Sequence, residues 1–140
     1  MTTDVNYIRT SKAPLPVVGT MNQAVVAGNT VFVSGTLGYT PGSLKLVSDN
    51  LEEQTIQTFR NVIAILEAAG SSTRNVVQAT IFLSDINDLE IVEKIYNQMF
   101  GSKTGAKTYL QPSSMYPDVK IQMEAIGITG KMEVEIKYDQ

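Results

Sequence analysis

One lysine stands out among the residues that could do chemistry in this chain. Residues 104–117 read TGAKTYLQPSSMYP, and Lys107 is the only charged residue among them. Apolar and hydroxyl residues flank it in a strand-like segment, Ala106 to Leu110, and the stretch contains no acid. Such a lysine is either a solvated residue whose aliphatic stem lies along apolar surface, or an anion hook in a binding site. The residues themselves leave both interpretations open.

A pair of polar side chains, Gln122 and Glu124, is the second candidate feature. They alternate with apolar residues in the segment VKIQMEAIGIT, residues 119–129. Because successive side chains of a strand point to opposite faces, both would lie on one face, opposite an apolar one. That face is either an ordinary polar surface or the polar lining of a site.

The third feature is the tripeptide Ser34-Gly35-Thr36 at the end of an apolar segment. A glycine at the end of a strand lets a ligand approach the backbone closely. A plain turn glycine explains the pattern equally well, so this feature alone assigns no function.

Several kinds of chemistry are excluded, because the chain has no histidine, cysteine or tryptophan. A Ser–His–Asp or Cys–His arrangement cannot form, and neither can a zinc site made of imidazoles or thiolates. A carboxylate-only Mg²⁺ or Ca²⁺ site would need clustered acids, and the sequence has no pattern such as D-x-D-x-D. We therefore expect no metal.

The composition is that of an ordinary globular domain, with 140 residues, 43% hydrophobic and 18% charged. The net charge is −3 and the basic residues are scattered, so nucleic-acid binding gets little support. No segment is long and apolar enough to cross a membrane. The N-terminal MTTDVNYIRT has no apolar signal-peptide core, so we expect an intracellular protein.

The first third of the chain predicts strands and loops. Strands are expected at residues 5–9, 23–26 and 30–34, the last two joined by a tight turn at Gly28-Asn29. The two prolines and Gly19 in residues 11–20 predict an extended loop with a turn. Residues 36–47, punctuated by glycine and proline, predict another loop.

The segment after residue 50 predicts a helix that ends at Gly70, where glycine is favoured. Asn50 and Glu53 have the spacing of a capping box, in which each side chain bonds the other residue's amide. A spacing of three and four residues predicts one apolar face on this helix. Its residues are Ile56, Phe59, Ile63 and Leu66.

The second half predicts a strand, a helix and two more strands. Residues 75–84 predict a central strand with Val77, Ala79, Ile81 and Leu83 on one face. Asn87 and Glu90 repeat the capping-box spacing before a helix that ends at Gly101. The apolar residues of this helix are Leu89, Val92, Tyr96 and Met99.

The strands that complete the domain are residues 106–110 and 119–129, and residues 130–140 form an extension that adds a short strand or stays mobile. This order of elements predicts one α+β domain, residues 1–140, with both helices on one face of a sheet. The other face is partly apolar, and oligomerisation is the usual way to bury such a face.

Taken together, these segments resemble the Rid (YjgF) family of reactive-intermediate deaminases over roughly residues 11–129. They occur in the family's order and at its spacing. The matching segments are SKAP, Gly19 with Gln23-Ala24, GNTVFVSG, EEQT…FRNV…LEAAGSS, VVQATIFLSDINDLEIVEKIYNQMF, GAKT and PDVKIQMEAIGI.

The resemblance implies a chorismate-mutase-like α+β fold, with a mixed sheet and two helices on one face. It also implies a homotrimer in which the sheets form an inner barrel and three clefts lie between subunits. The expected location is the cytoplasm, with the mitochondrial matrix as an alternative. Family members with the full motif hydrolyse 2-imino or 2-enamino acids to 2-oxo acids and ammonia without a cofactor. An activity like that of a 2-iminobutanoate/2-iminopropanoate deaminase is therefore expected.

The family's site positions can be placed on this chain, and its two main ones are changed. The arginine that grips the substrate carboxylate falls on Lys107, and the glutamate that positions water falls on Gln122. The remaining positions are expected to bind substrate. They are Met21 in place of a tyrosine, Ser34, Gly35 and Thr36 in place of an SGQ motif, Leu37, Asn87, Thr108, Tyr109 and Glu124.

These departures change the expected chemistry. Lysine offers a point charge in place of the two-pronged arginine contact, and a neutral glutamine can orient water but cannot act as a general base. Met21 adds flexible apolar surface, and Met115 and Tyr116 are expected near the rim. The pocket should therefore be more apolar and less selective for carboxylates.

Four functions remain open on this evidence. The chain is an imine or enamine hydrolase, or a tailoring enzyme in which Lys107, desolvated among Met21, Leu37 and Tyr109, forms a Schiff base. It could also be a ligand-binding trimer without catalysis. A ribonuclease or translation inhibitor is the least supported, because the chain is acidic and lacks histidine.

Overall fold

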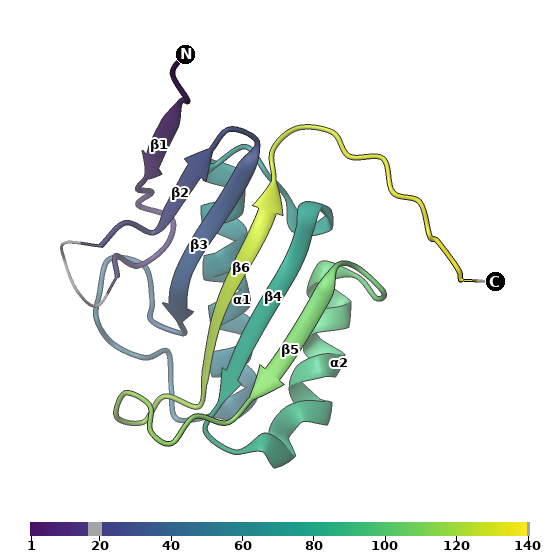
Figure 1. Ribbon diagram of the computed structural model, residues 1–140. Helices are drawn as coiled ribbons and strands as arrows, with labels where there is room; N and C mark the ends of the chain where they lie inside the picture. The colour runs from purple at the N-terminus through teal and green to yellow at the C-terminus, as the bar shows by residue number, and fades with distance from the viewer. Residues whose placement is uncertain (17–20, 140) are drawn as a thin grey trace.

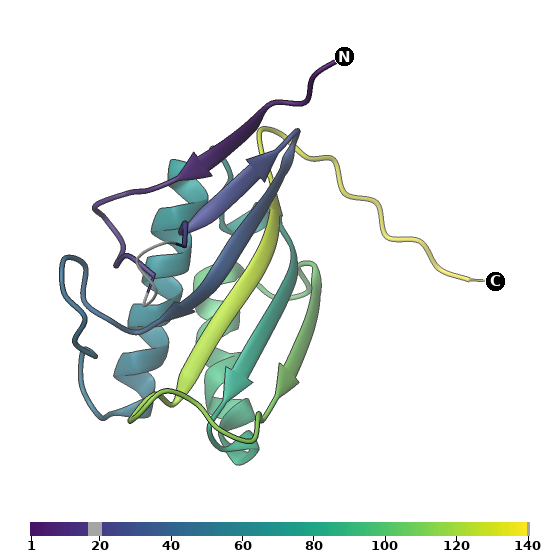
Figure 2. The ribbon, with the colours of Figure 1, turned by 60° about the vertical axis from the view of Figure 1, so that its left-hand side comes forward.

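The computed structural model describes residues 1–16 and 21–139. The turn expected at Gly19 lies outside the described residues. The fold is a six-stranded mixed sheet with two helices packed on one face (Figures 1 and 2), so the predicted α+β architecture is confirmed. Neither helix in the described part of the chain is long and apolar enough to cross a membrane.

The sheet has the strand order β1-β2-β3-β6-β4-β5. Neighbouring strands are antiparallel except β4 and β5, which are parallel and are joined through α2. The last strand along the chain, β6, therefore lies in the middle of the sheet (Figure 1). The strands are β1 (Val5–Ile8), β2 (Ala24–Ala27), β3 (Thr30–Leu37), β4 (Val76–Leu83), β5 (Ala106–Leu110) and β6 (Ile121–Ile128).

The helices are α1 (Leu51–Ala68) and α2 (Leu89–Phe100), with short 3₁₀ turns at Thr73–Asn75 and Ile86–Asp88. Three rings join them at the centre of the core. The rings of Tyr96 and Phe100 stack at 4.5 Å, and Phe59 meets both edge-on at 5.5 and 5.4 Å. Such aromatic pairs add to the stabilisation that burial alone provides.

The helix ends differ in detail from the predicted capping boxes. Asn50 does cap α1, since its Oδ1 accepts from the amide of Glu53, but the Glu53 carboxylate accepts from the Ser48 hydroxyl instead of the Asn50 amide. Asn87 is not the N-cap of α2. Its backbone N–H donates to Oδ1 of Asp85, which caps the preceding 3₁₀ turn, and α2 begins at Leu89.

The buried faces of the helices are also displaced from the predicted ones. Ile56 and Ile63 of α1, and Leu89 and Met99 of α2, are only partly buried. Polar residues fill part of the buried face of α1, because their side chains bond backbone groups. For example, the Asn61 amide donates to the carbonyls of Leu37 and Tyr39.

Two β-bulges shift the strand predictions. A bulge between Val33 and Thr36 lets β3 continue to Leu37, so Thr36 and Leu37 belong to the strand and not to the following loop. A second irregularity, between Val76 and Gln78, exposes Val77 and buries Val76. A bulge adds one residue to one strand, so it reverses the face on which the residues beyond it lie.

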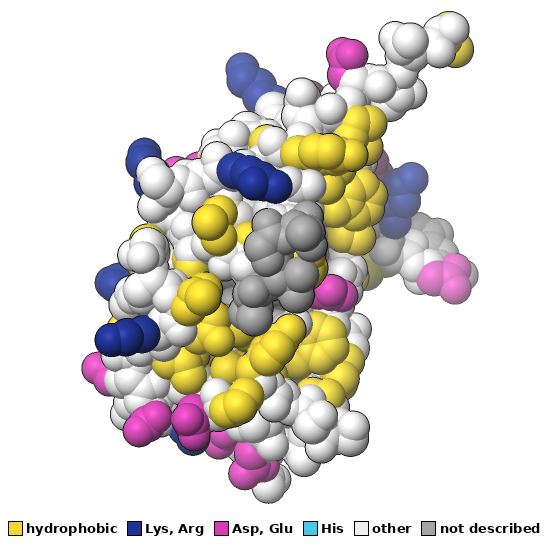
Figure 3. Space-filling view, turned by 90° about the vertical axis from the view of Figure 1, so that its left-hand side faces the viewer, with side chains coloured by type: hydrophobic (Ala, Val, Ile, Leu, Met, Phe, Trp, Pro, Cys, Tyr) yellow, Lys and Arg dark blue, Asp and Glu magenta, His cyan; other side chains and the backbone are white. Residues whose placement is uncertain are grey.

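The sheet face opposite the helices carries apolar residues, as expected. Phe32 is paired with Val25 and Ile126, and it remains 47% exposed. Further hydrophobic side chains gather on the side that carries β1 and the neighbouring loops (Figure 3). Tyr7 of β1 and Leu44 of the loop after β3 are also exposed. An exposed apolar area of this kind is typical of an interface.

Residues 131–139 form an exposed, extended segment that leaves the end of β6 (Figure 1). The strand that the sequence allowed there does not form among the described residues 131–139.

Candidate functional site

Lys107 is largely shielded from solvent and has an acidic partner. Its Nζ lies 2.7 Å from Oε1 of Glu93 on α2, and the side chains of the two residues are 19% and 32% exposed. The sequence around Lys107 contains no acid, so its counter-ion comes from a different element, 14 residues earlier in the chain.

Two tyrosines complete this group. The Tyr109 hydroxyl donates to Oε2 of Glu93, and the Lys107 ammonium lies 4.0 Å from the centre of the Tyr96 ring. An ammonium at that distance from an aromatic face is attracted to it. We call these four residues, Glu93, Tyr96, Lys107 and Tyr109, the lysine cluster.

The register of the sheet explains why the lysine cluster forms. Lys107 and Tyr109 of β5 pair with Ala79 and Ile81 of β4, which are buried beneath the helices. Residues paired across a sheet point to the same face, so Lys107 and Tyr109 point toward α2. Thr108 alternates with them and is exposed.

The cluster has a defined charge state at neutral pH. Burial acts to raise the pKa of Glu93, but the hydrogen bonds from Lys107 and Tyr109 and the charge of Lys107 outweigh it, so the pKa is below its ordinary value. Burial and then the Glu93 charge raise the pKa of Tyr96 to about 12. Burial, followed by the bond to Glu93, also raises the pKa of Tyr109. The cluster therefore holds one carboxylate, one ammonium and two neutral phenols.

Gln122 lies on the other side of the sheet, paired with Phe82 of β4 and Leu37 of β3. It lines an open hollow of about 480 Å³ together with Phe82 and residues of the loop after β5. The loop residues are Pro112, Ser114, Met115, Tyr116 and Pro117. Met115 and Tyr116 thus lie beside Gln122 in this chain, and their place at the rim of a substrate pocket stays a prediction.

Gly35 leaves the space that the Gln122 amide occupies. A Cβ added at Gly35 would overlap Nε2 of Gln122, so the amide lies directly over the glycine backbone at the β3 bulge. Gly35 therefore leaves room for the Gln122 amide at this position.

For the imine hydrolysis that the resemblance to the Rid family implies, we expect the substitution Gly35→Ala to displace the Gln122 amide and to lower the rate about tenfold, because a small misplacement of an orienting group is costly. The measurement is the rate of hydrolysis in a double-mutant cycle with Gln122→Ala. In the Gln122→Ala background no amide can be displaced, so Gly35→Ala should have little further effect. An equal loss in both backgrounds would contradict the contact.

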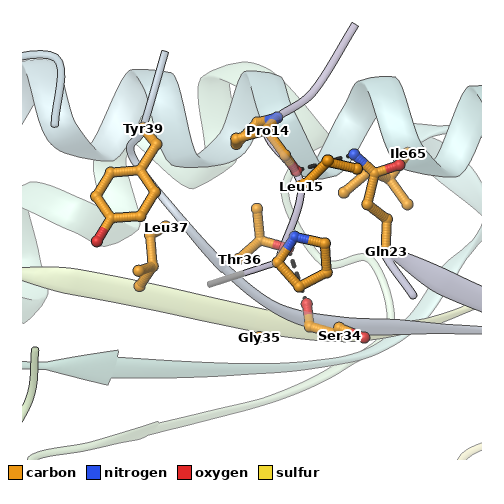
Figure 4. A pocket seen from close by; sticks show the side chains of 10 residues that line it. Pro14, Leu15, Gln23, Ser34, Gly35, Thr36, Leu37, Tyr39 and Ile65 are labelled. Atoms are coloured by element: carbon orange, nitrogen blue, oxygen red, sulfur yellow. Dashed lines mark hydrogen bonds between the residues drawn. The ribbon is translucent and has the colours of Figure 1, made fainter. Parts of the chain in front are cut away.

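Ser34, Thr36 and Leu37 line a second, much smaller pocket, shown in Figure 4. The Ser34 hydroxyl donates to the Asn22 carbonyl at 2.6 Å, and the Thr36 hydroxyl to the Ser34 carbonyl at 2.8 Å. The pocket measures about 20 Å³, which is room for about one water molecule. Within one chain these hydroxyls support the backbone and do not face a substrate-sized space.

The other expected site residues lie apart from the lysine cluster within one chain. Met21 and Asn87 are exposed, and Glu124 is exposed on the open face beside Thr80. Leu37 is on β3, which β6 and β4 separate from β5. The surroundings of Lys107 in this chain are thus its own cluster, not Met21 and Leu37.

Sequence reasoning missed Glu93 and Tyr96. A signal for them does exist, because Tyr96 belongs to the apolar face of α2 and Glu93 lies one turn earlier beside the buried Val92. Among the described residues, no three acidic side chains come together as a metal site.

The chain matches the family model described as Endoribonuclease L-PSP over residues 10–129. It is 39% identical to a RutC family protein of Pyrococcus abyssi over 120 residues, 86% of this chain and 94% of that one. It is 38% identical to the human 2-iminobutanoate/2-iminopropanoate deaminase, over 89% of this chain and 90% of that one.

A solved structure is similarly close. RidA from the Antarctic bacterium Psychrobacter sp. superimposes with a TM-score of 0.81 at 33% identity, covering 88% of this chain and 98% of that one. Fold and sequence therefore lead to the same group of proteins.

Proposed function

The chain belongs to the Endoribonuclease L-PSP family, which is the YjgF/Rid family, and on this premise we propose that it hydrolyses small imines or enamines to carbonyl compounds and ammonia. Relatives named as imine deaminases, 38% identical over nearly their whole length, support a reaction of this class. The proposed substrates are 2-imino or 2-enamino acids or their derivatives.

One observation carries the proposed arrangement of the site. Lys107 lies on the helix side of β5, an edge strand, whereas Gln122 lies on the open face of β6. The sheet separates the two side chains, so one small molecule can contact both only if a second copy of the chain supplies one of them. We therefore place the site in clefts between subunits, and propose a homotrimer whose open sheet faces are turned inward.

The proposed reaction needs few groups. Water adds to the C=N carbon to give a carbinolamine, and the carbinolamine then loses ammonia to leave C=O. The Gln122 amide orients the water by hydrogen bonding, and water itself takes up the proton, since an amide is not a base at neutral pH. The apolar lining beside Gln122 accommodates the substrate's side chain.

The alternative in which Lys107 forms a Schiff base has less support. It was motivated by the lack of an acid near Lys107, and Glu93 is in fact 2.7 Å away. An ammonium held by a carboxylate has no free lone pair with which to attack a carbonyl.

The proposal is tested by forming imines in solution and following their loss. 2-Iminobutanoate is formed by an amino-acid oxidase acting on 2-aminobutanoate with catalase present, and its methyl ester is formed by loss of HCl from methyl N-chloro-2-aminobutanoate. The rate of ammonia release is measured with and without the chain. We expect catalytic amounts to accelerate the release from at least one of the two. No acceleration at protein concentrations equal to that of the imine would overturn the proposed reaction. Sedimentation should give three times the chain mass of 15.3 kDa.

A further inference from the structure

We propose that Glu93 is an internal competitor for the substrate carboxylate, and that it adapts the site to imines without a free carboxylate group. This inference rests on the proposed function, because it takes Lys107 to face the substrate. Candidate substrates are uncharged, such as the imines of 2-oxo esters or 2-oxo amides, with a small apolar substituent.

The geometry of the lysine cluster is the first support. Glu93 is held at both oxygens, Oε1 by the Lys107 ammonium and Oε2 by the Tyr109 hydroxyl. The carboxylate is therefore fixed in orientation, unlike a surface glutamate held by one flexible partner. The face of Tyr96 occupies another side of the same ammonium.

Charge is the second support. The pairing of Lys107 with Glu93 leaves the cluster with no net charge, so the lysine no longer provides an unopposed cation. A carboxylate ligand approaching the ammonium would also approach Glu93, and like charges at such distances repel strongly in a partly buried site. An uncharged ester or amide meets no such repulsion.

The chemistry that remains available fits an uncharged substrate. Beside the Lys107 ammonium lie the Tyr96 ring and the Tyr109 hydroxyl, whereas the exposed Thr108 points to the opposite face of β5. The hollow at Gln122, which a second copy would supply, is lined mainly by Phe82, Met115, Tyr116 and two prolines. Neither surface contributes a further cation to hold a carboxylate.

The experiment compares the binding of two stable ligands, 2-oxobutanoate and its methyl ester, by titrating isotope-labelled trimer and following the backbone amides of residues 106–110. The test variant is Glu93→Gln, which keeps the shape and removes the charge. The control is Glu90→Gln, the same change one turn earlier on α2 at an exposed position. Tyr109→Phe is a second test variant, because it releases one oxygen of Glu93 without changing any charge.

We expect the wild type and Glu90→Gln to bind the ester at least as well as the acid. Glu93→Gln should bind 2-oxobutanoate about tenfold more tightly, with the ester affinity unchanged, as removal of one like-charge contact predicts. Tyr109→Phe should give a smaller gain in the same direction. If Glu93→Gln does not fold, tighter binding of 2-oxobutanoate by Tyr109→Phe supports the inference. An acid-to-ester affinity ratio that Tyr109→Phe leaves unchanged overturns it.

Three results would overturn the inference: an acid-to-ester ratio that Glu93→Gln leaves unchanged, a wild type that already prefers the acid tenfold, or no binding of either ligand to any variant. Binding is measured without turnover, so the two proposals can fail separately. If Glu93→Gln shifts the ratio of acid to ester affinity but the chain hydrolyses no imine, the inference about Glu93 stands and the proposed reaction is wrong. If the ratio is unchanged and the chain hydrolyses imines, the proposed reaction stands and the inference about Glu93 is wrong.

Discussion

Replacing both Lys107 by arginine and Gln122 by glutamate is expected to raise hydrolysis of 2-iminobutanoate by about 100-fold or more, since a positioned general base alone contributes about 10²–10⁴. The glutamate at position 122 would accept a proton from the attacking water, which the glutamine amide cannot do. It would also occupy the space that Gly35 already leaves open for a side chain of this size.

Arginine at position 107 should add orientation. A guanidinium has five N–H donors in a fixed fork, so one edge can keep the bond to Glu93 while the other holds a substrate carboxylate. A lysine ammonium, already engaged with Glu93 and Tyr96, cannot offer a second contact of that geometry. The gain should therefore be larger for the imino acid than for its methyl ester.

The measurement is the initial rate of ammonia release for the wild type, the two single variants and the double variant. Gln78→Glu serves as the matched control, because it makes the same change on β4 away from the Gln122 hollow. A wild type as fast as the double variant would show that lysine and glutamine suffice. A double variant no faster than Gln78→Glu would show that positions 107 and 122 do not meet at a reacting molecule.

The elements of this fold were predictable because their signals are local. The Gly28-Asn29 turn has a left-handed glycine at φ +61°, and Gly70 and Gly101 end the helices at φ +83° and +93°. The apolar face that the alternation in residues 119–129 predicts consists of Val119, Ile121, Met123 and Ala125, and all four are buried. Each of these patterns depends on neighbours within a few residues in the chain.

The errors arose where distant segments decide the outcome. Nothing near Val77 indicates the bulge that exposes it, because the bulge is defined by the partner strand β6. The pairing of Lys107 with Glu93 likewise depends on the parallel register of β4 and β5 and on how α2 packs above them. A charged residue's partner cannot be predicted from its own segment when the two lie on different elements.

The positions of the candidate site came from the resemblance and stay a prediction, and the contacts of these residues could not be predicted from the sequence. The resemblance selected Lys107, Gln122 and Gly35 by alignment alone. The structure adds that Gly35 makes room for Gln122 and that Glu93 neutralises Lys107. These two contacts change the question from why lysine replaces arginine to which substrate tolerates a cation that already has a partner.

Mixing two inactive variants is expected to restore hydrolysis if each cleft takes Lys107 from one subunit and Gln122 from another. The variants are Lys107→Met, which keeps the apolar stem against Tyr96, and Gln122→Leu. Each alone should lose about 100-fold, Gln122→Leu because it removes the group that orients water and Lys107→Met because it leaves the Glu93 carboxylate without its partner at the site. When both are unfolded and refolded together in equal amounts, about a quarter of the clefts should combine an intact Lys107 with an intact Gln122, if the subunits assemble at random.

The reciprocal mixture makes the result quantitative. Wild type refolded with an equal amount of the double variant Lys107→Met, Gln122→Leu should retain about a quarter of the activity if the site is shared, and about half if it lies within one chain. Lys107→Met leaves the half-buried Glu93 without its ammonium partner, so Lys107→Met, Glu93→Gln is run beside it to separate lost catalysis from lost stability.

A site shared between subunits thus requires that hydrolysis recovers when the two single variants are mixed. It also requires that wild type mixed with the double variant retains about a quarter of the wild-type activity. No recovery in the first and half in the second would place both residues in one chain, and the sheet that separates Lys107 from Gln122 would then have to rearrange. Because the two mixtures contain the same four kinds of side chain in equal amounts, only their distribution between subunits differs. The comparison therefore measures where the cleft lies, independently of how much each residue contributes to the rate.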